Sequence, residues 1–271
     1  MNKENILSKI SKMPEEEVID LACNTSDVEI LNILAENENC EVRCVVAGNK
    51  NTPANMLTML AQDKDADVRS GVASNENTSV DVLTMLAKDE DIYVRWAVAN
   101  NRNTPADVLA ILAKDKYDDV RWAVAVNKNT SVNVLAMLAK DEDDDVRRTV
   151  AGNKNTSVET LVMLVRDKEW WVRSAVALNE NTPVETLAVL AKDIDWRVRE
   201  EVALNASTSA DMLAMLAKDV VIDVRCAVAK NKNTSVETLV MLSKDNNEGV
   251  SEAAKDALKE HKEKNKTSME R

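Results

Sequence analysis

The sequence predicts an all-α solenoid of about eight to nine repeats, each built from two helices. First, a Val-Arg pair recurs every 26 residues without insertion or deletion, its Arg at positions 43, 69, 95, 121, 147, 173, 199 and 225. Second, leucines recur in phase with that pair, at helical spacing. Third, only four Gly and four Pro occur in 271 residues, which disfavours a strand-rich chain. A fixed period of this length is typical of solenoids, whose units bury their apolar sides against their neighbours.

The first helix of a typical unit is expected to open at Asn77-Thr78-Ser79-Val80-Asp81, with the Thr78 hydroxyl accepting from the backbone N–H of Asp81. In three units a proline follows that threonine, at the position predicted to be the first of the helix (Pro53, Pro105 and Pro183). Leu83, Leu86 and Ala87 then give the apolar stripe of an amphipathic helix about ten residues long.

The second helix is predicted from about Tyr93 to Ala99, after the polar turn 88–91. It is short enough to be α or 3₁₀, and only stacking between units can stabilise it. Asn101 is expected to end it, because Asn tolerates the left-handed cap conformation.

The extent of the repeat divides the chain into three segments. Residues 1–23 are predicted to form an N-terminal helical cap, with Pro14 separating two short helices. Residues 24–249 form the repeat array, and residues 250–271 a C-terminal helical cap that fades into a disordered tail after about residue 263.

The composition limits the classes of partner. A net charge of −12 argues against nucleic acid, whose phosphates require clustered Lys and Arg, and favours cationic or neutral partners. No apolar run approaches the length of a membrane helix, and no signal peptide is evident, so we expect no membrane partner. The four cysteines are then expected to be reduced thiols in a cytoplasmic, monomeric protein.

Some positions keep one residue type in nearly every unit, and these are predicted to hold the array together. The Leu positions form the core, and Met at 59, 85, 137, 163, 215 and 241 is interpreted as adaptable core filler. The repeated Arg and the Asp six residues before it are expected to form an ion-pair ladder between or within units. The repeated Asn are expected to form turns and hydrogen bonds between repeats.

Three other positions vary from unit to unit: one and two residues before the repeated Val (V−1 and V−2) and two after it (V+2). All five tryptophans lie there, beside several acids, and we expect these side chains to be at least half exposed. Exposed aromatics flanked by acids are typical of a recognition surface. The candidate partner-binding residues are Tyr93, Trp96, Asp119, Trp122, Asp145, Arg148, Trp170, Trp171 and Trp196. In the alternative interpretation, the indoles fill shallow grooves between short helices.

Residues for other chemistry are scarce. The single histidine, His261, lies in the charged C-terminal segment, and no glycine-rich phosphate loop occurs. Asp141, Asp143 and Asp145 lack the Gly and Glu of a calcium loop. We therefore expect no catalytic residue, no metal and no cofactor.

The repeated motif Leu-Ala-Lys-Asp, Val-Arg-x-x-Val-Ala-x-Asn and Asn-Thr-Pro/Ser resembles the leucine-rich repeat variant family over about residues 24–250. The resemblance implies a right-handed superhelix of α-helices alternating with short or 3₁₀ helices. The founding type also carries a cysteine-ligated iron–sulfur domain, but Cys23, Cys40 and Cys44 are only three thiols, so we expect no cluster here. The Val-Arg half also resembles the second helix of HEAT repeats, which implies that the second helices line the concave surface.

These observations predict a non-catalytic scaffold that binds a protein or peptide on its aromatic and acidic concave surface. Two alternatives remain open. A HEAT-like nucleic-acid-binding protein would need a basic groove, and an enzyme like the HEAT-like lyases would need acid–base residues that the repeat lacks.

Overall fold

The computed structural model describes the backbone of residues 3–269, and within that range every regular element is an α-helix. The second helices of the repeats carry even numbers: α4 (Cys40–Gly48), α6 (Ala66–Ser74), α8 (Ile92–Asn100), α10 (Asp118–Val126), α12 (Asp144–Gly152), α14 (Trp170–Leu178), α16 (Trp196–Leu204) and α18 (Ile222–Lys230). The first helices carry odd numbers: α3 (Val28–Leu34), α5 (Ala54–Leu60), α7 (Val80–Leu86), α9 (Ala106–Leu112), α11 (Val132–Leu138), α13 (Val158–Leu164), α15 (Val184–Leu190), α17 (Ala210–Leu216) and α19 (Val236–Leu242).

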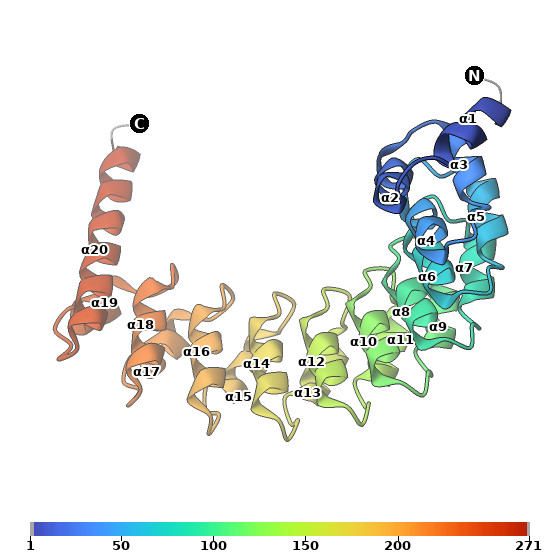
Figure 1. Ribbon diagram of the computed structural model, residues 1–271. Coiled ribbons are helices and arrows are strands. Elements are labelled where there is room, and N and C mark those ends of the chain that lie inside the picture. The colour runs from blue at the N-terminus through green and yellow to red at the C-terminus, as the bar shows by residue number, and fades with distance from the viewer. Residues whose placement is uncertain (1–2, 270–271) are drawn as a thin grey trace. The chain divides into compact units, whose positions relative to one another are not determined.

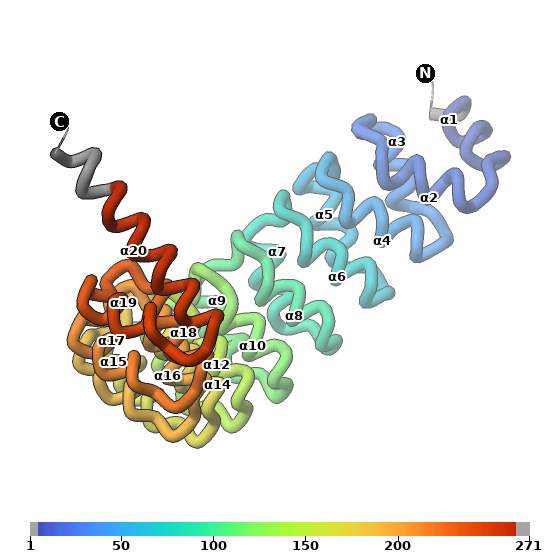
Figure 2. The backbone as a smooth tube through the Cα atoms, turned by 90° about the vertical axis from the view of Figure 1, so that its left-hand side faces the viewer, coloured from blue at the N-terminus to red at the C-terminus, as the bar shows by residue number. Residues whose placement is uncertain are grey.

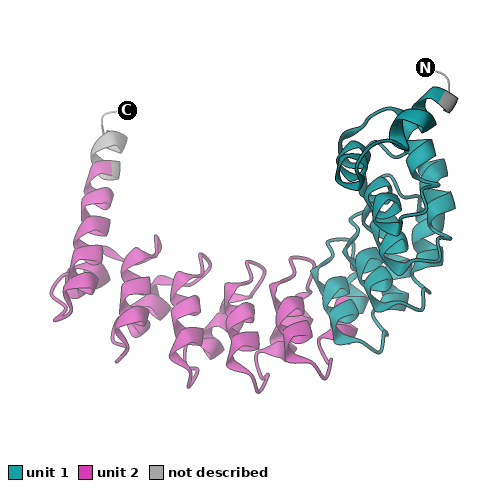
Figure 3. Ribbon diagram, viewed as in Figure 1, with its two compact units in different colours: residues 1–134 teal, residues 135–271 magenta. Residues whose placement is uncertain are grey.

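The chain divides into two compact units, residues 1–134 and 135–271 (Figure 3). Within each unit the even-numbered helices pack directly on one another in one row, and the odd-numbered helices form a second, more widely spaced row (Figures 1 and 2). Because the even-numbered helices are more closely spaced than the odd-numbered ones, the even row is the inner side of any curvature within one unit. The predicted α-solenoid of 26-residue repeats is confirmed.

The helix lengths differ from those predicted. The odd-numbered helices of the array have seven residues rather than about ten, whereas the even-numbered ones have nine and are α rather than 3₁₀. The odd helix starts late because Ser79, not Thr78, is its N-cap, accepting from Val82 N–H. The Thr78 hydroxyl instead donates to the buried Val72 carbonyl 2.5 Å away. Pro53 likewise lies at the N-cap, one residue before its predicted place.

The repeated Asn does not cap the even helices in the left-handed conformation. Asn101 is extended, with φ −66° and ψ 125°, and none of the described non-glycine residues has positive φ. Its buried amide Nδ2 donates to Ala73 O at 2.7 Å and Asn75 O at 3.1 Å, both in the preceding repeat. The predicted hydrogen bonds between repeats are therefore confirmed, and they replace the predicted helix cap.

The repeated Arg and Asp form the predicted ladder, and its ion pairs join successive repeats. Arg95 donates from Nε to Asp115 Oδ2 at 2.5 Å and from Nη2 to Asp115 Oδ1 at 3.1 Å, and its Nη1 donates to Asp89 O at 2.7 Å. Equivalent pairs join Arg43–Asp63, Arg69–Asp89, Arg147–Asp167, Arg173–Asp193, Arg199–Asp219 and Arg225–Asp245. Each Arg thus connects the second helix of one repeat to the turn of the next.

The core consists of the Leu positions, as predicted, but the Met positions lie outside it. Leu83 is fully buried, whereas Met85 is 44% exposed and Met137 and Met163 are similarly open. Two residues along a helix turn a side chain through about 200°, so Met85 points away from the layer that Leu83 contacts. The interpretation of these methionines as core filler is wrong.

The ends of the array are helical. α1 (Lys3–Ile10) and α2 (Glu15–Asn24) flank Pro14, and α2 packs on α4 as an even-numbered helix does. Asn49 donates to Ala22 O, so repeat-type bonding reaches into the predicted cap. α20 (Glu248–Met269) packs on α18 and α19 and runs through most of the segment predicted to be disordered; residues 270–271 lie outside the described range.

Candidate partner-binding surface

The candidate residues lie on the even-numbered helices, on the side turned away from the core. In α8, Val94, Ala97 and Val98 are buried against neighbouring helices. Because side chains recur every 3.6 residues, this leaves Tyr93 and Trp96 on the outer side of the same two turns. The three variable positions thus share one face of the even row, which we call the even-helix face.

In the first unit, this face carries Tyr93 and Trp96 on α8 and Asp119 and Trp122 on α10. Tyr93 is 69% exposed and Asp119 is exposed, but Trp96 and Trp122 are only 39% and 38% exposed. The expectation of at least half exposure is therefore wrong for these indoles. They lie partly against the even row and keep an open side.

A V+2 side chain faces the first turn of the next even helix. The Cys44 thiol donates to Asp67 O, and the Ser70 hydroxyl donates to Tyr93 O, each at 3.5 Å. Both acceptors are V−1 residues of the following repeat. By the same register, Trp96 faces the turn that carries Asp119.

In the second unit, Asp145 and Arg148 lie three residues apart on α12. An Arg148 guanidinium nitrogen lies 3.5 Å from Asp145 Oδ1, and both side chains are well exposed. This pair shows that a V−1 carboxylate reaches the V+2 side chain of its own helix.

Trp170, Trp171 and Trp196 lie on α14 and α16 of the second unit. The rings of Trp170 and Trp171 meet edge to face, with centroids 5.6 Å apart, and both residues are half-buried. The indole Nε1–H of Trp171 donates to Asp144 Oδ2 at 2.8 Å, in the preceding repeat. This is the arrangement that the groove-filling interpretation predicts for Trp171, while Trp196 is 36% exposed.

The sequence prediction missed Arg197, which completes this cluster. Its guanidinium carbon lies 3.5 Å from the ring centroid of Trp170 and 5.9 Å from that of Trp196. Asp195 accepts from its Nε at 3.0 Å and from its Nη2 at 2.8 Å. One signal was available, because Arg197 is the only basic residue at any V−1 position from Glu41 to Asp223.

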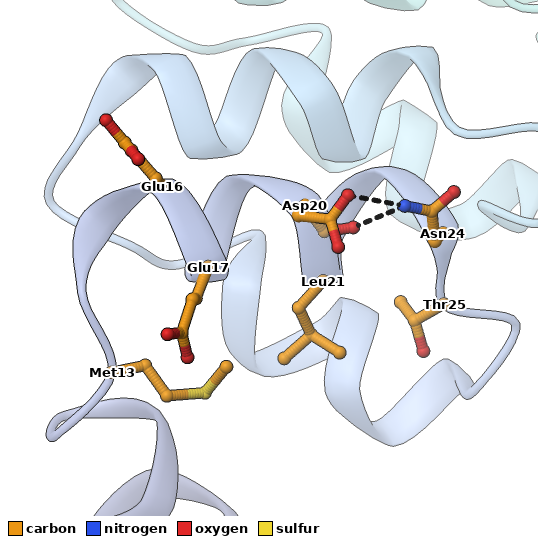
Figure 4. Close-up of a pocket in the computed structure, with 7 residues that line it drawn as sticks. All are labelled: Met13, Glu16, Glu17, Asp20, Leu21, Asn24 and Thr25. Atoms are coloured by element: carbon orange, nitrogen blue, oxygen red, sulfur yellow. Dashed lines mark hydrogen bonds between the residues drawn. The ribbon is translucent and has the colours of Figure 1, made fainter.

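A separate hollow lies in the first unit beside α2 (Figure 4). It has a volume of about 590 Å³ and is lined by Met13, Glu16, Glu17, Asp20, Leu21, Asn24 and Thr25. The Asn24 amide donates to the carbonyl and carboxylate oxygens of Asp20. None of the predicted residues lies here.

The even-helix face offers aromatic rings, carboxylates and one stacked guanidinium, which suit recognition of a polar or cationic segment. Among the described residues, no three His, Cys, Asp or Glu side chains converge as metal ligands would. No helix in the described range combines the length and apolarity needed to cross a bilayer.

No family model and no curated protein matches the chain. Among solved structures, it is similar to a leucine-rich repeat variant with a novel repetitive structural motif, at 27% identity and a TM-score of 0.63, covering 83% of this chain and 88% of that one. It also matches the Escherichia coli protein YibA at 19% identity and a TM-score of 0.48, covering 96% of this chain and 97% of that one. Importin beta matches at 12% identity and a TM-score of 0.41, covering 94% of this chain and 41% of that one.

The first of these structures shares both the helical architecture and more than a quarter of the aligned residues. The resemblance of this chain to the leucine-rich repeat variant family, first seen in its repeated motif, is therefore confirmed by its structure.

Proposed function

We propose that the protein is a non-catalytic scaffold that binds a protein or peptide segment on the even-helix face. The observation that supports this most is the confinement of irregular and aromatic residues to one face of an otherwise constant repeat. The Leu, Asn and Arg–Asp positions, which hold repeats together, keep their residues, while V−2, V−1 and V+2 hold Trp, Tyr, Asp, Arg and Ser in turn.

The chemistry of this face favours a cationic or neutral partner. Acids occupy V−1 at Glu41, Asp67, Asp119, Asp145 and Asp223. Partly open indoles beside carboxylates are a combination that hot spots of protein interfaces use, because an aromatic ring supplies area and a carboxylate supplies orientation. The net charge of −12 also attracts cationic partners to the protein at long range.

A matched set of alanine variants tests the proposal. Tyr93→Ala and Asp145→Ala remove exposed side chains of the even-helix face, and Met85→Ala and Ile111→Ala remove exposed side chains of the odd helices. We expect the first pair to reduce capture of partners from a cell lysate about tenfold, as truncation of an interface anchor does. The second pair should leave capture unchanged, and all four should keep their urea unfolding midpoints.

The opposite pattern would contradict the proposal. If the Met85 and Ile111 variants lose the captured proteins while the Tyr93 and Asp145 variants keep them, the odd-numbered helices carry the binding surface. Quantitative mass spectrometry of the captured proteins measures both outcomes in one experiment.

A further inference from the structure

The second unit shows which ligand chemistry an indole of the even-helix face and a neighbouring N-cap carboxylate accommodate. The Arg197 guanidinium stacks 3.5 Å from the Trp170 ring centroid while Asp195 accepts two of its hydrogen bonds. A planar, delocalised cation satisfies the ring face and the carboxylate at once. Here the cation belongs to the chain itself, and its side chain is 41% exposed.

The first unit has the same kinds of group, indole and carboxylate, near Asp119, although they occupy other positions of the repeat. In the Cys44–Asp67 and Ser70–Tyr93 contacts the V+2 side chain of one helix donates to the backbone carbonyl of the V−1 residue of the next, so this register brings Trp96 next to the backbone of Asp119. Asp119 and Trp122 lie three residues apart on α10, as Asp145 and Arg148 do on α12, and this spacing places both side chains on one side of the helix. Asp119 is therefore an exposed carboxylate on the same side of α10 as the partly open Trp122, and it lies next to the helix that carries the partly open Trp96.

Unlike Trp170, these two rings stack on no cation of the described residues. Among the cation–ring contacts of the described residues, none involves Trp96 or Trp122. The adjacent V−2 residue is a second exposed acid, Asp118, which adds negative charge at the same turn. A guanidinium suits this setting better than an ammonium, because its planar face stacks on indole and its two parallel N–H groups match a carboxylate.

We infer that Trp96, Asp119 and Trp122 form a site for an arginine side chain of the partner. This inference rests on the proposed function, whose partner it assigns to the arginine-bearing class. The carboxylate orients the guanidinium, and the indoles cover its faces. Arg197 occupies the related cluster of the second unit, so that cluster accepts an external arginine only after Arg197 is removed.

The test uses acetyl-arginine methylamide as the probe and the five indole N–H signals of the full chain, read by NMR and assigned with Trp→Phe variants. We expect the Trp96 and Trp122 signals to shift saturably, and acetyl-lysine methylamide to bind about three times more weakly. Asp119→Asn should weaken arginine binding about three- to fivefold, the range of an exposed ion pair. The Trp171 signal should stay in place, because Asp144 holds that N–H.

Asp67→Asn is the matched control, because Asp67 occupies the same V−1 position between Cys44 and Ser70 instead of two indoles. Asp67→Asn should leave the binding of acetyl-arginine methylamide unchanged. In Arg197→Ala, the Trp170 signal should become responsive to the same probe. Equal binding of the lysine probe, indifference to Asp119→Asn, or no response of Trp170 in Arg197→Ala would each overturn the inference.

The experiments can refute the arginine site and the proposed scaffold surface independently of each other. If the probe does not bind but Tyr93→Ala still abolishes partner capture, the even-helix face binds a partner without arginine recognition. If the probe binds as expected but capture depends on Met85 and Ile111, the arginine site stands and the proposed scaffold surface is wrong.

Discussion

Replacing Asn101 by alanine should lower the free energy of unfolding by about 3–5 kcal/mol, because two buried hydrogen bonds and one partly buried hydrogen bond are lost together. The Asn101 amide donates to Ala73 O and Asn75 O, and its Oδ1 accepts from Asn103 N–H at 2.8 Å. The alanine variant leaves the buried Ala73 O without this donor, while Asn75 O keeps the backbone N–H of Thr78. Each unsatisfied buried group costs roughly 1–3 kcal/mol.

Urea unfolding followed by far-ultraviolet circular dichroism measures this loss, and Asn103→Ala is its control. Asn103 is exposed, and its amide donates to Glu76 O, also in the preceding repeat. Water can replace that donor, so the control should cost about 1 kcal/mol or less. Equal losses in the two variants would show that burial does not decide the strength of the bonds between repeats.

Replacing Asp115 by alanine should cost about 3–5 kcal/mol, because it leaves the buried Arg95 guanidinium unpaired. The two side chains are only 9% and 8% exposed. The control is Glu76→Ala, which breaks the exposed Arg102–Glu76 pair and should cost at most about 1 kcal/mol. Differential unfolding in urea at neutral pH compares the two, and a loss of less than about 1 kcal/mol in Asp115→Ala would contradict the ladder's structural role.

The loss of stability in Asp115→Ala is expected to depend on pH. Burial by itself raises the pKa of Asp115, but hydrogen bonds from Arg95 and from Tyr117 N–H outweigh it, so the pKa lies below its ordinary value. The stabilisation is therefore fully present above the unfolded pKa of about 4 and is lost as the pH falls through the lower folded pKa. The difference between wild type and Asp115→Ala should shrink accordingly below about pH 4.

The 26-residue period, the all-α class and the bonds between repeats could be predicted from the sequence. Residues that recur in every unit of one chain identify the positions that hold the units together. Arg95 and Asp115 recur at fixed separation in nearly every unit, as residues that meet across a repeated interface must. The Asn101 bonds were predicted on the same ground. The acceptor atoms of these bonds could not be predicted, because the spacing of residues along the chain does not reveal the distance between the ends of successive helices.

Predictions that depend on the spacing between helices failed. Met85 is apolar and recurs with the same 26-residue period as Leu83, but it lies on the opposite side of its helix, and the odd-numbered helices do not pack closely enough to cover it. The prediction that Trp96 is at least half exposed is wrong, because the closely packed even row covers part of its ring. The stacking of Arg197 on Trp170 joins residues of two repeats, and only their register in space reveals it.

Site-specific photo-crosslinking tests the central claim most directly, since it asks which row of helices the partner touches. A benzophenone amino acid is placed at Tyr93 in one variant and at Met85 in another, both exposed positions in the same repeat region. Crosslinking in a cell lysate should give a discrete adduct from position 93 and none from position 85. An adduct from position 85 alone would contradict the claim and move the binding surface to the odd-numbered helices.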